Sequence, residues 1–162
     1  MVSVRSYKLT ETDRVAALDL IKEYVEATAL ELGWTEEEII PYVDEYDNFP
    51  GPYREKGDFL LVEFQGRLAG CVGITPGADG LCEMNRLWVR SDYRRHGLGR
   101  VLVEASLRRA AELGYQRMGL DVLASRLKAL HLYQSLGFEQ CRPFHEYEFE
   151  VIGLERKLDR LG

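Results

Sequence analysis

RRHGLGR, residues 94–100, separates an apolar segment from a long amphipathic one. The first N–H groups of a helix have no partner within the helix, and the helix dipole makes that end electropositive. Gly97 and Gly99 have no Cβ, so a ligand can approach the backbone, and Arg94, Arg95 and Arg100 add full positive charges. A turn of this kind predicts a site for phosphate oxygens.

Two well-known phosphate-binding motifs do not match this turn. The chain lacks G-x-x-x-x-G-K-[ST], and position 102 holds leucine where G-x-G-x-x-G needs its third glycine. An ordinary turn before a helix is therefore the alternative interpretation at this point.

The charge distribution favours a compact anionic ligand. The net charge is −6, but seven arginines lie between Arg86 and Arg109, against Asp92 and Glu104. An acidic chain with one local basic patch is atypical of proteins that bind long nucleic acids, so we expect no nucleic-acid partner.

The remaining composition predicts one cytoplasmic globular domain over residues 1–162. With 46% apolar residues the chain can bury a core, and it has no run of 18 apolar residues that could span a membrane. Its start lacks the apolar middle of a signal peptide. Three widely spaced cysteines and no H-E-x-x-H motif indicate reduced thiols and no metal site.

Periodicity predicts strands and helices in the order β-α-α-β-β-β-α-β-α-β-β. The predicted strands cover about residues 3–9, 59–64, 67–75, 81–89, 116–123, 138–141 and 147–158. The predicted helices run from about 12 to 33, from 35 to near Pro41 or Tyr46, over 98–114, and from 125 to 137. Hairpins followed by alternating helices and strands predict an α/β fold with a mixed sheet.

Several local details accompany this prediction. Thr10 or Thr12 should cap the first helix, and Ser125 the last one. Thr35 with Glu38 forms a capping box, and the sequence Gln65-Gly66 fits a two-residue hairpin turn.

The chain resembles the GNAT superfamily of N-acetyltransferases. The family signature [Q/R]-x-x-G-x-[G/A] after the fourth strand is matched by Arg94, Gly97 and Gly99. A second match is ALHLYQSLGF, in which Tyr133 stands four residues before Gly137. The resemblance covers nearly the whole chain. It implies a three-layer fold with a central mixed, mostly antiparallel sheet flanked by helices.

The resemblance also implies that acetyl-CoA is the cosubstrate. The loop's backbone amides would hold its pyrophosphate, Arg94 would help to shape the loop, and the splayed end of the fourth strand would pair with the pantetheine arm. The implied cofactor-binding residues are Leu87, Trp88, Val89, Arg94, Arg95, His96, Gly97, Leu98, Gly99 and Arg100.

Tyr133 is the candidate general acid. A phenol within hydrogen-bonding reach can protonate the departing thiolate. The alternative is that Tyr133 only fills the apolar stripe of its helix, together with Ala129, Leu132 and Leu136.

Glu83 is the candidate base, acting through a water, because the acceptor amine has to lose a proton. A catalytic glutamate of histone-acetylating relatives looks similarly placed. Strand alternation predicts that Glu83, Asn85, Leu87 and Val89 share one side of the strand. A solvated Glu83 is the alternative, Asp121 and His145 are weaker candidates, and water alone is sufficient in many relatives.

One position departs from the family pattern. The final helix of relatives often starts N-x-x-A, and Arg126 holds the place of that asparagine. Arg126 could meet a phosphate, but we expect it to point to solvent.

The sequence says least about the amine that would accept the acetyl group. In similar enzymes the pocket is built from the first two helices and the next loop, a region that contains Tyr42, Tyr46, Phe49 and Tyr53 among carboxylates. These groups suit a cationic amine, although aromatic side chains tucked into the core fit as well. A small-molecule amine, an amino acid and a peptide N-terminus all stay open. A non-catalytic acyl-CoA-binding module is the alternative function, and homodimers are common among similar proteins.

Overall fold

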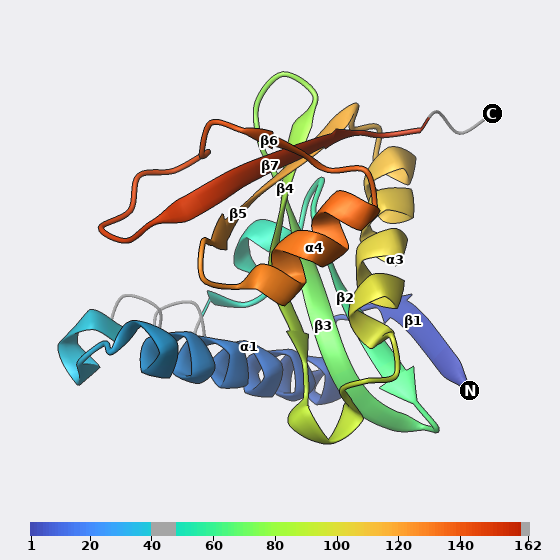
Figure 1. Ribbon diagram of the computed structural model, residues 1–162. Coiled ribbons are helices and arrows are strands. Elements are labelled where there is room, and N and C mark those ends of the chain that lie inside the picture. Colours follow the sequence, from blue (N-terminus) through green and yellow to red (C-terminus); the bar gives the residue numbers. More distant parts are fainter. Residues whose placement is uncertain (40–47, 160–162) are drawn as a thin grey trace.

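A computed structural model describes residues 1–39 and 48–159 (Figure 1). Seven strands form one sheet in the order β1-β2-β3-β4-β5-β7-β6. The strands are β1 (Val2–Ser6), β2 (Asp58–Phe64), β3 (Arg67–Pro76), β4 (Leu81–Val89), β5 (Arg117–Leu123), β6 (Glu139–Cys141) and β7 (Val151–Lys157). The helices are α1 (Glu11–Leu32), α3 (Leu98–Glu112) and α4 (Leu127–Ser135), with 3₁₀ turns η1 (Gly51–Tyr53) and η2 (Ser91–Tyr93).

The predicted three-layer α/β architecture is confirmed. All neighbouring strands are antiparallel except β4 and β5, which run parallel. One core cluster joins the sheet to α3 and α4, and a second cluster on the other face joins it to α1. No helix of the described residues is long and apolar enough to cross a bilayer.

Most of the predicted local details are confirmed. Thr10 is the N-cap of α1 and accepts a hydrogen bond from the Asp13 N–H. Residues 36–39 are helical, and the Glu38 carboxylate accepts from both the N–H and the hydroxyl of Thr35. Gln65 and Gly66 have φ values of 52° and 79°, as a type I′ hairpin turn requires. The end predicted for the second helix lies outside the described residues.

The cap predicted at Ser125 is wrong. α4 begins at Leu127, and its N-cap is Arg126, which makes no side-chain capping bond. The Ser125 hydroxyl instead donates to the Glu31 carboxylate at 3.3 Å. The Ser125 hydroxyl thus binds a carboxylate on α1, distant in sequence, instead of capping its own helix.

The prediction that one face of β4 carries Glu83, Asn85, Leu87 and Val89 is also wrong. Cys71 pairs with Trp88 but Gly73 pairs with Asn85, so two steps along β3 match three along β4. Arg86 is in the left-handed region, with φ of 56°. An extra residue in a strand is a β-bulge, and it reverses which side chains face which layer.

The odd-numbered side chains of β4 therefore point to one layer before Arg86 and to the other layer after it. Asn85, before the reversal, accepts a hydrogen bond from the Tyr53 hydroxyl in the α1 layer. Leu87 and Val89, after it, pack against the cluster under α3 and α4.

β4 and β5 stay together over only three residue pairs. The last pair joins Glu83 to Gly119, although β4 continues to Val89 and β5 to Leu123. Beyond Glu83 the two strands diverge, so the main chain of β4 is open toward β5. This divergence positions the cavities described below.

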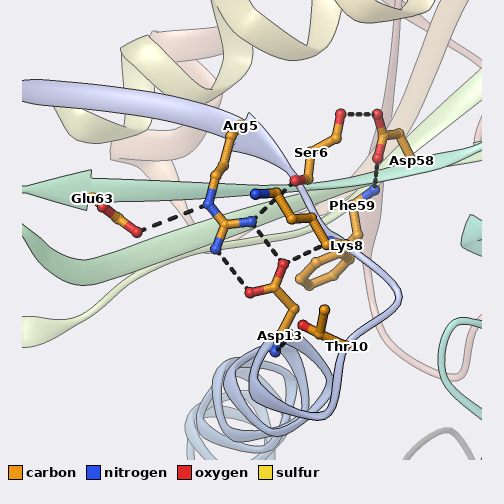
Figure 2. Close-up of polar contacts among 8 residues, drawn as sticks. All are labelled: Arg5, Ser6, Lys8, Thr10, Asp13, Asp58, Phe59 and Glu63. Carbon is orange, nitrogen blue, oxygen red and sulfur yellow. Dashed lines mark hydrogen bonds and ion pairs between the residues drawn. The ribbon is translucent and has the colours of Figure 1, made fainter.

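Partly buried polar contacts fix the start of α1 against β1 and β2 (Figure 2). Arg5 donates two hydrogen bonds to the two oxygens of Asp13, at 2.7 and 2.8 Å. The hydrogen bond from Arg5, opposed by burial, lowers the pKa of the Asp13 carboxyl to about 2. Asp58 on β2 accepts from the hydroxyl of Ser6 and from Arg109 of α3. These contacts lie away from the cavities and hold the layers together.

Candidate active site

The turn before α3 presents a row of free backbone donors. Gly97 is its N-cap, with φ of 73° and no side-chain cap, and Arg95 also has a positive φ of 70°. The first bond into the helix runs from the Val101 N–H to the Gly97 carbonyl. Within the described chain, the N–H groups of residues 95–100 donate no hydrogen bond outside the helix. Such a turn can bind anionic oxygens.

Side chains on either side hold this turn in place. Arg94 donates from Nε to the Val89 carbonyl at 3.0 Å, and its guanidinium lies 4.8 Å from the centre of the Trp88 ring. The His96 ring stacks on Phe64 at 4.6 Å. The turn is therefore tied to the ends of β4 and β2.

A cleft of about 740 Å³ opens where β4 and β5 diverge. We call it the large cleft. Six residues of the sequence-based site line it, namely Leu87, Trp88, Val89, Arg94, Gly99 and Tyr133. Arg95, His96, Gly97 and Arg100 are exposed on the turn beside it, and the Leu98 side chain is buried in the core. The turn and the diverging strand thus form one continuous surface.

Tyr133 lies on α4 with its side chain 6% exposed, packed edge-on against Phe138 at 5.7 Å. It lines the large cleft, and its hydroxyl forms no hydrogen bond with another described residue. Burial is the main cause that raises the pKa of Tyr133 above its usual value, and nearby Arg126 opposes the shift. The phenol therefore keeps its proton at neutral pH and can donate it into the cleft.

A second cavity of about 220 Å³ adjoins the large cleft. Six residues line both spaces: Tyr24, Met84, Asn85, Arg86, Asp121 and Arg126. Arg86 and Arg126 each lie over the Tyr24 ring, at 5.5 and 5.6 Å from its centre. The two spaces meet at the divergence of β4 and β5.

Glu83 and His145 meet in the second cavity. Nε2 of His145 lies 2.7 Å from Oε1 of Glu83, and the His145 side chain is the more exposed of the two. Glu83 is thus paired with an imidazole, not merely solvated on the strand. A carboxylate that binds an imidazole can hold it as a proton acceptor.

Asp121 anchors the segment that carries His145. Its carboxylate accepts hydrogen bonds from the N–H groups of Phe144 and His145 and from the Tyr147 hydroxyl, at 2.9 to 3.1 Å. A Cβ at Gly119 would lie 2.3 Å from the Phe144 ring, so glycine is needed where this ring packs. Asp121 therefore positions the segment, because its oxygens are already bonded.

The expectation that Arg126 points to solvent is wrong. It donates to Glu31 from Nε at 3.0 Å and to the Thr28 hydroxyl at 2.8 Å, both on α1. Its guanidinium also lies 3.5 Å from the Tyr24 hydroxyl. The carboxylate on α1, far away in sequence, holds this side chain between the two cavities.

Of the four aromatic residues expected to form the acceptor pocket, two lie in the core and two lie outside the described residues. Phe49 and Tyr53 are buried among Tyr7 and Phe59 in the core under α1, so here the core interpretation is right. Tyr42 and Tyr46 lie outside the described residues. The aromatic side chains that line the second cavity are others: Tyr24, Trp34, Tyr147 and Phe149. The aromatic spacing of FHEYEF, residues 144–149, could have indicated Tyr147 and Phe149, but no local signal indicates Tyr24 or Trp34.

The family model of the acetyltransferase (GNAT) family matches residues 20–138. An uncharacterised N-acetyltransferase of Schizosaccharomyces pombe is 35% identical over 132 residues, covering 78% of this chain and 76% of that protein. Human N-acetyltransferase 8 is 35% identical over 92 residues, 53% of this chain. That match covers 40% of the human protein, so the chain spans less than half of its length.

Solved structures agree in fold. A GNAT acetyltransferase from Staphylococcus aureus Mu50 has a TM-score of 0.77 at 14% identity, over 98% of this chain and all of the other. PaiA N-acetyltransferase from Thermoplasma acidophilum, solved in complex with coenzyme A, has a TM-score of 0.75 at 18% identity, over 97% and 99%. With its signature turn, its divergent strands and these matches, the chain belongs to the acetyltransferase (GNAT) family.

Proposed function

We propose that this protein is an acetyl-CoA-dependent N-acetyltransferase that acts on a primary amine by direct transfer in a ternary complex. One observation carries the proposal. The large cleft, with a proton donor, and the second cavity, with a proton acceptor, share six lining residues. Two substrates can therefore meet there without a covalent enzyme intermediate.

The turn before α3 fits the diphosphate of the cosubstrate. Its free N–H groups over residues 95–100, the left-handed Gly97 and the nearby arginines suit phosphate oxygens. Leu87, Trp88 and Val89 present main chain and side chains along the cleft for the pantetheine arm. Bound acetyl-CoA would supply the acetyl group as a thioester whose leaving group is a thiolate.

The protein's own residues would handle the protons. Glu83, with His145, takes the proton that the acceptor nitrogen loses as its bond to the acetyl carbon forms. Tyr133 gives its proton to the sulfur as the carbon–sulfur bond breaks, and solvent then restores it. The open main chain of β4 beyond Glu83 offers donors for the negative charge on the carbonyl oxygen.

Two measurements test this function. Isothermal titration should detect acetyl-CoA binding, and an amine panel should release coenzyme A thiol together with an acetylated product of the expected mass. No heat and no thermal shift at millimolar acetyl-CoA would reject the assignment.

The alternative is a non-catalytic acyl-CoA-binding module, which would also need the turn. It gives no reason for a buried phenol in one cavity and a carboxylate–imidazole pair in the adjoining one. Binding of acetyl-CoA without transfer to any amine would favour it.

A further inference from the structure

Aromatic rings form one wall of the second cavity. The Trp34 ring lies 6.0 Å from the Phe149 ring, which lies 5.0 Å from the Tyr147 ring. Trp34 follows the end of α1, while the other two come from the segment between β6 and β7. The wall is therefore built from two distant parts of the chain.

Charges on the second cavity balance. Among its described lining residues other than His145, the two carboxylates of Glu83 and Asp121 balance the two guanidinium groups of Arg86 and Arg126. Arg126 is paired with Glu31 at 2.9 Å, so a substrate with several ammonium groups would chiefly have to place one of them near the Arg86 guanidinium. A polyamine is therefore a poor fit, because like charges repel in a cavity of low dielectric constant.

The same residues leave one place for an ammonium or amine group. Asp121 already accepts hydrogen bonds from two backbone N–H groups and from the Tyr147 hydroxyl. Glu83, on the neighbouring strand β4, has His145 as its hydrogen-bond partner. One carboxylate with remaining acceptor capacity thus lines the same cavity as the aromatic wall.

We infer that the acceptor is a small monoamine with an aromatic body, whose nitrogen lies at Glu83 and His145 and whose ring packs against Trp34, Tyr147 and Phe149. This inference rests on the proposed function and narrows its acceptor. Acetyl transfer would form the nitrogen–carbon bond, break the carbon–sulfur bond, move one amine proton to the Glu83–His145 pair and one Tyr133 proton to the sulfur.

Matched amines test the inference. Phenethylamine, ethylamine and spermidine are compared with acetyl-CoA at saturating concentration, by thiol release and product mass. Since one methylene in an apolar pocket changes kcat/KM by roughly 10- to 200-fold, the aryl ring should raise it about 100-fold or more over ethylamine. Spermidine should be no better than ethylamine.

Variants of the wall provide the second comparison. Trp34→Ala and Phe149→Ala should lower kcat/KM for phenethylamine about tenfold or more while ethylamine stays within about twofold. Trp34→Phe, which keeps a ring, should retain most of the preference. Thermal unfolding of each variant shows whether it is folded.

A readout without turnover separates the two proposals. In the complex with coenzyme A, phenethylamine should shift the Trp34 indole resonance and ethylamine should not. Such a shift without acetylation would overturn the proposed catalysis and leave the binding inference standing. Acetylation of spermidine or ethylamine as efficiently as phenethylamine would overturn the inference and leave the catalysis standing.

Discussion

Oε1 of Glu83 lies 2.7 Å from Nε2 of His145, although the two residues are 62 positions apart in the sequence. β4 supplies the carboxylate, and the segment held by Asp121 supplies the imidazole. Their pairing places the proton acceptor of the proposed reaction in the second cavity, which adjoins the large cleft.

Substitution of the carboxylate should slow the reaction. General base catalysis contributes about 10²- to 10⁴-fold, so Glu83→Gln should lower kcat by about 100-fold or more at neutral pH, with a small effect on the Kd of acetyl-CoA. Stopped-flow thiol release and isothermal titration measure the two quantities. His145→Gln should give a loss in the same direction, and wild-type kcat in both variants would contradict a role for the pair.

Tyr133→Phe removes a single hydroxyl from the lining of the large cleft. We expect kcat to fall by about 100-fold, because the thiolate then leaves without a proton donor, while the KM of acetyl-CoA changes less than about threefold. Burial raises the pKa of Tyr133, so the wild-type rate should show no loss from its ionisation up to about pH 10, its ordinary value. Wild-type turnover in the phenylalanine variant would leave Tyr133 a packing residue.

Gly99 gives a test of the proposed cosubstrate site. A Cβ there would meet nothing closer than Leu132 at 3.5 Å, so the fold can accept a side chain, but the cleft it lines would be filled. Gly99→Phe should weaken acetyl-CoA binding about tenfold or more, because the ring would displace the ligand from its position. The melting temperature should change little. Unchanged affinity in titration calorimetry would show that the cosubstrate does not use this turn.

Asp13 makes a stability prediction separate from catalysis. Its pKa is lowered from 3.8 to about 2, so its contribution to the free energy of unfolding is present above about pH 4 and is lost as the pH falls toward 2. Asp13→Asn should lower the free energy of unfolding by about 1–2 kcal/mol at pH 7, since solvent screens the partly exposed Arg5.

Urea titrations at pH 7 and pH 2 check this, and the two proteins should differ little at pH 2. Glu63→Gln is the matched control, because that carboxylate lies 3.9 Å from the same arginine but is 39% exposed (Figure 2). An equal loss in both variants would mean that burial of Asp13 is not the cause.

The sequence predicts the elements that local chemistry determines. The turn at Gln65-Gly66, the cap at Thr10 and the start of α3 after Gly97 all depend on neighbouring residues, and all three appear in the structure. Tyr133 and Gly99, which the motifs indicated, line the large cleft.

Contacts between distant segments could not be predicted in this way. Ser125 and Arg126 bind Glu31, about 95 positions earlier, in place of the cap and the solvent that local patterns suggest. Likewise, nothing local to Trp34 indicates that it packs on Phe149. Such pairs form only when tertiary packing brings two elements together.

The extra residue in β4 has a consequence for comparing relatives. The side chains before and after Arg86 alternate out of step. One strand therefore gives the polar side chains of Glu83 and Asn85 to the second cavity and the apolar side chains of Leu87 and Val89 to the large cleft. An alignment gap placed one position away would assign each of these side chains to the wrong cavity. Superposition through both Glu83 and Val89, not through either alone, keeps the two cavities matched between homologues.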